Sequence, residues 1–208
     1  PTMTPTRHII IDLETLDTHP SATILTIGLV TVEISDDGLD IFGRHYWRVL
    51  PFEQPGRTAS DETLEWWRQQ SPQALNEALN TSDLHREPLP QILSAVSATL
   101  EMFPHPIWGN GSDFDNVIMK HAFQQVGLIW PPYSNRCLRT ARQIAKSVAP
   151  NFQTPERPAH LTPHIAIDDA EYEAQLLAHY MFAIDGNRPY PTNTLPRSGQ
   201  QLDGAAVL

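Results

Sequence analysis

The 208-residue chain has a single cysteine, Cys137, so it cannot close a disulfide within itself. A chain without internal disulfides is typical of a reducing compartment, and we expect a cytoplasmic location. The sequence also lacks any run of about 18 apolar residues, the length that a membrane span needs, and shows no secretory signal. These absences argue against a disulfide-stapled secreted scaffold, and we expect no membrane partner.

Positive charge is scarce, because 14 Lys and Arg residues stand against 24 Asp and Glu residues, giving a formal net charge of −10. Proteins that coat nucleic acid by bulk electrostatics are usually basic, so the composition disfavours that class. An enzyme that grips a few nucleotides through metal ions stays compatible, because bound cations reverse the sign of a carboxylate cluster. The length suits one globular domain with a sizeable core.

The apolar pattern predicts three strands, then helices that alternate with short strands. Ile9, Ile10 and Ile11 predict a strand buried on both faces, and β-branched stretches at 22–32 and 41–50 predict two more in an antiparallel meander. The remaining predicted elements are helices at 63–67, from 71, at 89–103, 113–126, 140–148 and 166–182, and strands at 107–109 and 136–138. We expect an α/β fold with an N-terminal extension at 1–6, one domain at 7–184 and a Pro/Gly-rich surface tail at 185–208.

Two carboxylates, Asp12 and Glu14, follow the isoleucine strand one residue apart. If the strand continues, its period of two puts both side chains on one face. Neighbouring like charges at the end of a buried strand cost free energy unless a cation holds them, and Mg²⁺ or Mn²⁺ takes such oxygen ligands. The alternative is that both residues simply begin a solvated turn.

Two further acidic clusters stand where helices are predicted to begin. Asp113 and Asp115 follow a short strand, and each alone is explained as a helix cap or a complement to the helix dipole. Asp168 and Asp169 open the last predicted helix, with His164 in the loop before it. A loop histidine and an aspartate one turn into the helix can face one point, where they supply a metal ligand and a general base.

Taken in order, these motifs resemble the three exonuclease motifs of the DEDDh superfamily, which includes proofreading exonucleases, ribonuclease T and oligoribonuclease. The matching residues are Asp12-Leu13-Glu14-Thr15, the pattern N-x-x-x-F-D at 110–115 and the pattern H-x-A-x-x-D at 164–169. The stretches 63–72 and 136–140 resemble a branch with a phage DNA exonuclease A and a mycobacterial-type 3′–5′ exoribonuclease. The resemblance covers residues 7–183.

The resemblance implies a ribonuclease-H-like fold, with a mixed five-stranded sheet flanked by helices. It also implies a 3′–5′ exonuclease that releases 5′-mononucleotides from single-stranded DNA or RNA by a two-metal-ion mechanism. The implied ligands of two divalent ions, Mg²⁺ or Mn²⁺, are Asp12, Glu14, Asp115 and Asp169, and the implied general base is His164. The motif spacing favours Asp115 and Asp169 over their neighbours Asp113 and Asp168, and Asp113 is better explained as a helix-start residue.

Six more residues are candidate substrate contacts, each with a structural alternative: Thr15, Ile27, Gly28, Trp66, Trp67 and Asn110. Thr15 either bonds the terminal nucleotide or caps a strand–turn junction, and Asn110 either orients a ligand or closes a turn. Ile27-Gly28 either lets the substrate approach closely or marks a bulge. Adjacent helical residues lie about 100° apart, so one tryptophan can stack on a base while the other is core. The alternatives are that both belong to the core or that they form an interface with a partner.

Arg139 stands where many members of the superfamily have aspartate, and it marks either a phosphate contact or a structural one. Two other functions fit the sequence: a catalytically silent nucleic-acid-binding or scaffold module of the same fold, and a metal-dependent nucleotidase. Retention of all five expected site residues favours an active enzyme over a silent module. The sequence does not choose between DNA and RNA, and it leaves the oligomeric state open, with a homodimer as one alternative.

Overall fold

The computed structural model describes residues 3–186, 190–191 and 197–198. At its centre is a mixed sheet with the strand order β5-β4-β1-β2-β3-β6. The strands are β1 (Thr6–Thr15), β2 (Ile24–Ser35), β3 (Gly38–Arg48), β4 (Ile107–Gly109), β5 (Asn135–Cys137) and β6 (Arg197–Ser198). The α/β class and the antiparallel meander of β1, β2 and β3 are confirmed, and β4 and β5 continue the sheet in parallel. The two-residue β6 joins the edge beyond the five predicted strands, and most of the predicted tail lies outside the described residues.

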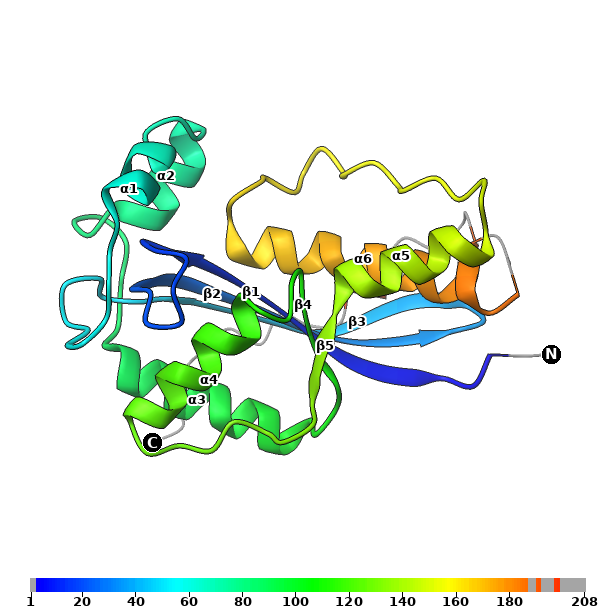
Figure 1. Ribbon diagram of the computed structural model, residues 1–208, viewed down its shortest axis with the longest axis horizontal. Helices are drawn as coiled ribbons and strands as arrows, with labels where there is room; N and C mark the ends of the chain where they lie inside the picture. Colours follow the sequence, from blue (N-terminus) through cyan, green and yellow to red (C-terminus); the bar gives the residue numbers. More distant parts are fainter. Residues whose placement is uncertain (1–2, 187–189, 192–196, 199–208) are drawn as a thin grey trace.

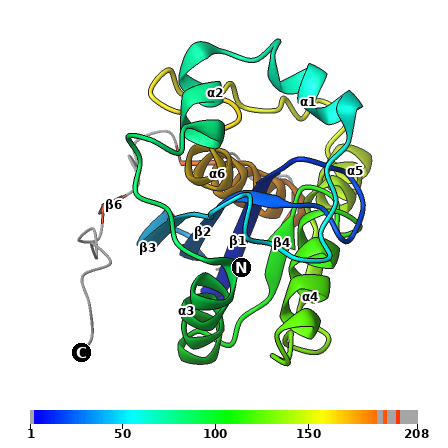
Figure 2. The same cartoon turned by 90° about the vertical axis from the view of Figure 1, so that its left-hand side faces the viewer.

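Helices cover both faces of the sheet and one of its ends (Figures 1 and 2). They are α1 (Asp61–Trp67), α2 (Pro72–Leu79), α3 (Leu89–Met102), α4 (Asp115–Gln125), α5 (Leu138–Val148) and α6 (Ala166–Ile184). The pair α5 and α6 lies on one face and the pair α3 and α4 lies on the other (Figure 2). Helices α1 and α2 lie together at one end of the strands (Figure 1). In the described part of the chain, no helix is long and apolar enough to cross a membrane.

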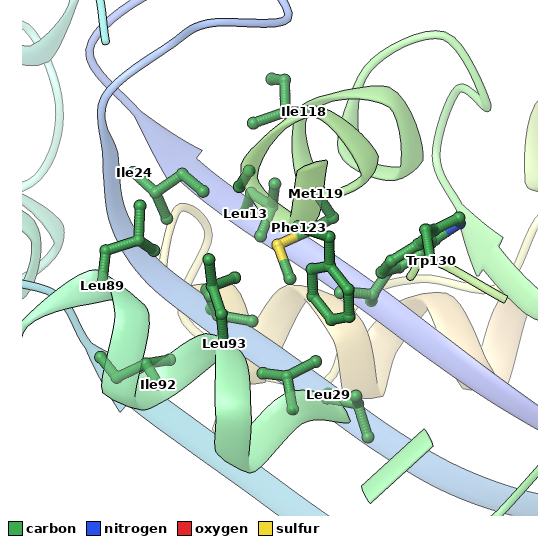
Figure 3. Close-up of a cluster of buried hydrophobic side chains, with 14 of the residues drawn as sticks. Leu13, Ile24, Leu29, Leu89, Ile92, Leu93, Ile118, Met119, Phe123 and Trp130 are labelled. Atoms are coloured by element: carbon green, nitrogen blue, oxygen red, sulfur yellow. The ribbon is translucent and has the colours of Figure 1, made fainter. Parts of the chain in front are cut away.

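The isoleucine run sits at the middle of the sheet, and its alternation divides the core in two. Ile9 and Ile11 belong to the cluster that packs under α3 and α4, part of which Figure 3 shows. Ile10 belongs to the cluster formed with α5 and α6. All three isoleucines are fully buried, so the prediction of a strand covered on both faces is confirmed.

Two predicted helix starts need correction. The helix expected from 113 begins at Asp115, because Gly111 adopts a φ of +128° and accepts a hydrogen bond from the N–H of Phe114, closing a turn ahead of the helix. Asp113 lies in that turn and is not a helix-start residue. The helix expected from 140 begins at Leu138, directly after β5.

Gly28 lies where α6 crosses β2. A Cβ atom added to it would stand 2.2 Å from the carbonyl oxygen of Ala166, the first residue of α6. Gly28 also pairs in regular register with Asp12 and Tyr46, so it is not a bulge. The close approach that this glycine permits is therefore that of α6 onto the sheet.

Gly28→Ala is expected to lower the free energy of unfolding by about 1–3 kcal/mol, the usual cost of overpacking a rigid interior. The added methyl group meets backbone atoms of Ala166 and Ile167 rather than a flexible side chain, so the start of α6 must shift. Urea denaturation of both proteins measures the change. A variant as stable as the parent would contradict this account of the glycine.

Candidate active site

An open cavity of about 810 Å³ lies at the carboxyl end of β1, bordered by residues of α1, α4 and α6. Its lining includes the five residues carried over from the motifs: Asp12, Glu14, Asp115, His164 and Asp169. Asp12 and Glu14 have the same parity along β1 as Ile10, so they point to the face that α6 covers. The strand register shifts immediately after Glu14, and the chain turns away from the sheet there.

Asp115 reaches the same point from the other side of β1. It is the first residue of α4, and its Oδ1 atom accepts a hydrogen bond from the N–H of Leu13 at 3.2 Å. Its side chain is buried. The bond joins two motifs that stand 102 residues apart in the sequence.

His164 and Asp169 approach from the loop and first turn of α6. The N–H of His164 donates to Asp169 Oδ2 at 2.7 Å, and His164 has a φ of +63°, which residues other than glycine rarely adopt. One potential ligand atom each from Glu14, His164 and Asp169 lies within 4.8 Å of the others. Three groups at that separation can surround one ion.

Asp168 and Asp113, the sequence neighbours of the candidate ligands, lie outside the cavity. Asp168 Oδ2 accepts a hydrogen bond from the N–H of Thr162 at 2.9 Å, and its Oδ1 stands 3.9 Å from the guanidinium of Arg44. Asp113 is exposed in the turn before α4. Neither residue is among those that line the cavity, whereas Asp115 and Asp169 are.

The carboxylates raise one another's pKa. Burial raises the pKa of Asp12 well above its usual value, and the charges of Glu173 and Asp115 raise it further. Burial, followed by Asp169 and Asp115, does the same for the pKa of Glu14. Burial also raises the pKa of Asp115 to about 7, although hydrogen bonds to its carboxylate oppose the rise.

This donor set suits a hard divalent cation such as Mg²⁺ or Mn²⁺. Its members are carboxylate oxygens with one imidazole, and crowded buried carboxylates favour the charged form only when a cation joins them. Part of the required positive charge is already present, because the guanidinium of Arg157 contacts Asp169 Oδ1. The carboxylates still outnumber this guanidinium, so the cavity can bind divalent cations.

Glu173 is a member of this cluster that the sequence motifs did not reveal. It lies one turn after Asp169 on α6, lines the cavity and is buried. Burial, then Asp115 and Asp169, raises its pKa, against the side chain of Asn110 and the charge of Arg157. The spacing of four residues from Asp169 was the available signal, because such pairs share one helix face.

The two tryptophans of α1 have different surroundings. Trp67 is fully buried, and its Nε1 donates to the carbonyl oxygen of Thr15 at 2.9 Å. Trp66 is 40% exposed and lines the cavity. Its ring meets that of His164 edge-on, with 4.8 Å between centroids. Of the pair, only Trp66 lies where a substrate can touch it.

The other candidate substrate contacts divide in the same way. Thr15 and Asn110 line the cavity, and the Thr15 hydroxyl donates to the carbonyl oxygen of Asp17 at 2.7 Å, which fits the predicted junction role. Ile27 is fully buried in the core, and Gly28 packs against α6, so neither lines the cavity. Arg139 lines it too and lowers the pKa of the nearby Asp115.

Comparison with known families gives a match over residues 7–181, to a family described as the Rv2179c-like 3′-5′ exoribonuclease domain. No curated protein sequence matches the chain. The family match spans β1 through most of α6 and so includes every residue of the carboxylate cluster.

Solved structures similar to this one include several of exonuclease I. The apo form of exonuclease I matches 86% of this chain and 44% of its own, with a TM-score of 0.61 and 14% identity. E. coli exonuclease I in complex with a dA16 oligonucleotide matches 86% of this chain and 42% of its own, with a TM-score of 0.59 and 14% identity. The zinc-bound E. coli complex with single-stranded DNA matches 83% and 40%, with a TM-score of 0.57 and 15% identity. The chain thus spans less than half the length of these structures, which share its fold.

Proposed function

Since the chain belongs to the family of Rv2179c-like 3′-5′ exoribonuclease domains, we propose that it is a metal-dependent 3′–5′ exonuclease that releases 5′-mononucleotides from single-stranded nucleic acid. The observation that carries the proposal is the convergence of carboxylates from β1, α4 and α6 on one open cavity. The exonuclease I structures with single-stranded DNA support a single-stranded partner, and the family description supports RNA.

The residues that would hold two divalent ions are Asp12, Glu14, Asp115 and Asp169. Such ions, when bound, supply charge neutralisation at the scissile phosphate and an acidified water. The chain's own contribution is to fix the carboxylates. The N–H of Leu13 orients Asp115, and the N–H of His164 orients Asp169. Arg139 and Arg157 add positive charge to the cavity wall, where a phosphate enters.

His164 is the proposed general base, which takes a proton from the attacking water through its imidazole. Three observations support this role. The N–H of His164 bonds Asp169, the residue lines the cavity, and the Trp66 ring packs edge-on against the imidazole. These features place the imidazole at the cavity, and its alignment with the attacking water would be completed when substrate binds.

The test of the function is an assay with end-labelled DNA and RNA oligonucleotides of matched sequence. We expect successive shortening from the 3′ end with Mg²⁺ or Mn²⁺ and none with EDTA. Product analysis for 5′-mononucleotides separates this activity from a nucleotidase, which would release phosphate from free nucleotides instead. Binding of oligonucleotides without shortening, with both metals present, would indicate a silent binding module and overturn the proposal.

Asp169→Asn is expected to reduce turnover to less than about 1% of the parent, since a lost metal carboxylate costs several kcal/mol of transition-state stabilisation. Asp168→Asn is its matched control, because the neighbouring aspartate bonds Thr162 and faces away from the cavity. The control should keep turnover close to that of the parent, because Asp168 does not line the cavity and its 3.9 Å contact with Arg44 contributes at most weakly to stability. Equal losses in both variants, with folding intact, would contradict the assignment of Asp169.

A further inference from the structure

Besides the four motif carboxylates, two buried carboxylates line the cavity, Asp17 and Glu173. Asp17 accepts a hydrogen bond from the N–H of Thr18, whereas the role of Glu173 is unexplained. Its side chain is 4% exposed, yet its Oε2 atom has no hydrogen-bond partner among the residues that the structure describes. A buried charge without a partner is costly, and proteins rarely keep one without a compensating cation. Asn110 lies beside the carboxyl group, but an amide does not neutralise it.

The position of Glu173 on α6 places its side chain beside the other carboxylates of the cavity. Residues four apart on a helix are neighbours on one face, so Glu173 stands one turn beyond Asp169. Asp12 approaches from β1, and after burial the charge of Glu173 is the largest influence that raises the pKa of Asp12. The cavity therefore has a carboxylate wall along α6 as well as along β1.

Glu171 on the same helix shows what an ordinary buried glutamate does here. It is equally buried, at 4% exposure, but it is not a cavity residue. Arg44 stands 2.7 Å from its carboxylate and supplies a permanent counter-charge. Glu173 has the same burial but forms no ion pair within the described residues, and Arg157 acts on it only from beyond ion-pair distance, so a cation bound in the cavity would supply the missing counter-charge.

We propose that Glu173 is a fifth carboxylate of the metal site, which helps to hold the divalent cations from the α6 wall of the cavity. This rests on the proposed function, because it assigns a further residue to the same ions. A free, buried oxygen aimed into an acidic cavity is the donor that Mn²⁺ or Mg²⁺ would complete. The free energy that the unpaired carboxylate costs the metal-free protein would be offset when an ion binds.

The test is calorimetric titration of Mn²⁺ into the metal-stripped 208-residue chain, which measures binding without any substrate. Glu173→Gln should weaken the binding of Mn²⁺ roughly 10-fold or more, in line with the effect of groups that support metal ligands. Glu171→Gln, the matched control, should leave the affinity unchanged. Asp12→Asn should abolish measurable binding. Glu173→Asp keeps the charge and should recover much of the parental affinity.

Thermal unfolding of the same proteins excludes a merely structural role. Without metal, Glu173→Gln should melt at or above the temperature of the parent, because it removes an uncompensated buried charge. Glu171→Gln should melt lower, because Arg44 loses its 2.7 Å ion pair and keeps only the 3.9 Å contact with Asp168. Added Mn²⁺ should raise the melting temperature of Glu173→Gln less than that of the parent, and it should raise that of Glu171→Gln as much as that of the parent.

The outcomes separate the inference from the function on which it rests. Parental Mn²⁺ affinity in Glu173→Gln, with binding lost in Asp12→Asn, would overturn the role of Glu173 and leave the proposed function standing. A Glu173→Gln protein that melts well below the parent without metal would also overturn it, by showing a packing role. A parent chain that binds no Mn²⁺ would overturn both.

Discussion

Asp115→Asn should lower the rate of 3′–5′ mononucleotide release by about 10³-fold or more, because one metal carboxylate is worth several kcal/mol in the transition state. The substitution keeps the shape of the side chain and an oxygen for the N–H of Leu13, so the link between β1 and α4 survives. What it removes is one negative charge beside Asp12 and Glu14. Single-turnover assays with an end-labelled oligonucleotide and excess enzyme measure the loss directly.

Two controls show that such a loss is not unfolding. Asp113→Asn, two residues earlier and exposed outside the cavity, should keep parental turnover. The metal-free Asp115→Asn protein should be more stable than the parent, since burial raises the pKa of Asp115 from 3.8 to about 7 and its charged form opposes folding. The stability difference should therefore grow as the pH rises through that interval, and not as it falls. A variant that is inactive and also less stable at neutral pH would contradict this account.

His164→Ala should reduce turnover about 10²- to 10⁴-fold, the usual contribution of a positioned general base. Potential ligand atoms of His164, Glu14 and Asp169 lie within 4.8 Å of one another, so the geometry also allows the imidazole to act as a metal ligand. Calorimetry with Mn²⁺ separates the two roles. A base leaves the ion affinity of the variant close to that of the parent, whereas a ligand lowers it together with the rate.

His160→Ala is the matched control for this experiment. His160 stands four residues earlier in the same loop, and its side chain is 71% exposed. Its removal should leave both turnover and ion affinity unchanged. Near-parental turnover of His164→Ala at neutral pH would make that histidine structural and would leave catalysis to the metal ions alone.

The elements that could be predicted from the sequence are those governed by local pattern. Three isoleucines define a strand covered on both faces, and the period of two puts Asp12 and Glu14 side by side. The order of the motifs then indicated Asp115 and Asp169, which the structure brings to the same cavity. Helix starts were less accurate, because turn geometry at Gly111 and the direct passage from β5 to α5 are set by packing.

The remaining site features depend on which face of a helix meets the sheet, and no single segment encodes that. Glu171 and Glu173 are chemically identical, and only the rotation of α6 over β1 gives one an arginine and the other the cavity. Trp66 and Trp67 are separated in the same way by the docking of α1. Gly28 looked like a place for substrate or a bulge, because the helix that fills the space lies 138 residues later, at Ala166.

The site draws its acidic groups from β1, near one end of the described chain, and from α6, near the other. A polypeptide emerging from the ribosome therefore exposes Asp12 and Glu14 long before Asp169 and Glu173 exist. Domains fold as units during synthesis, so no half-made chain can assemble this cavity. The carboxylate cluster is therefore complete only after α6 has been translated and has packed onto the sheet.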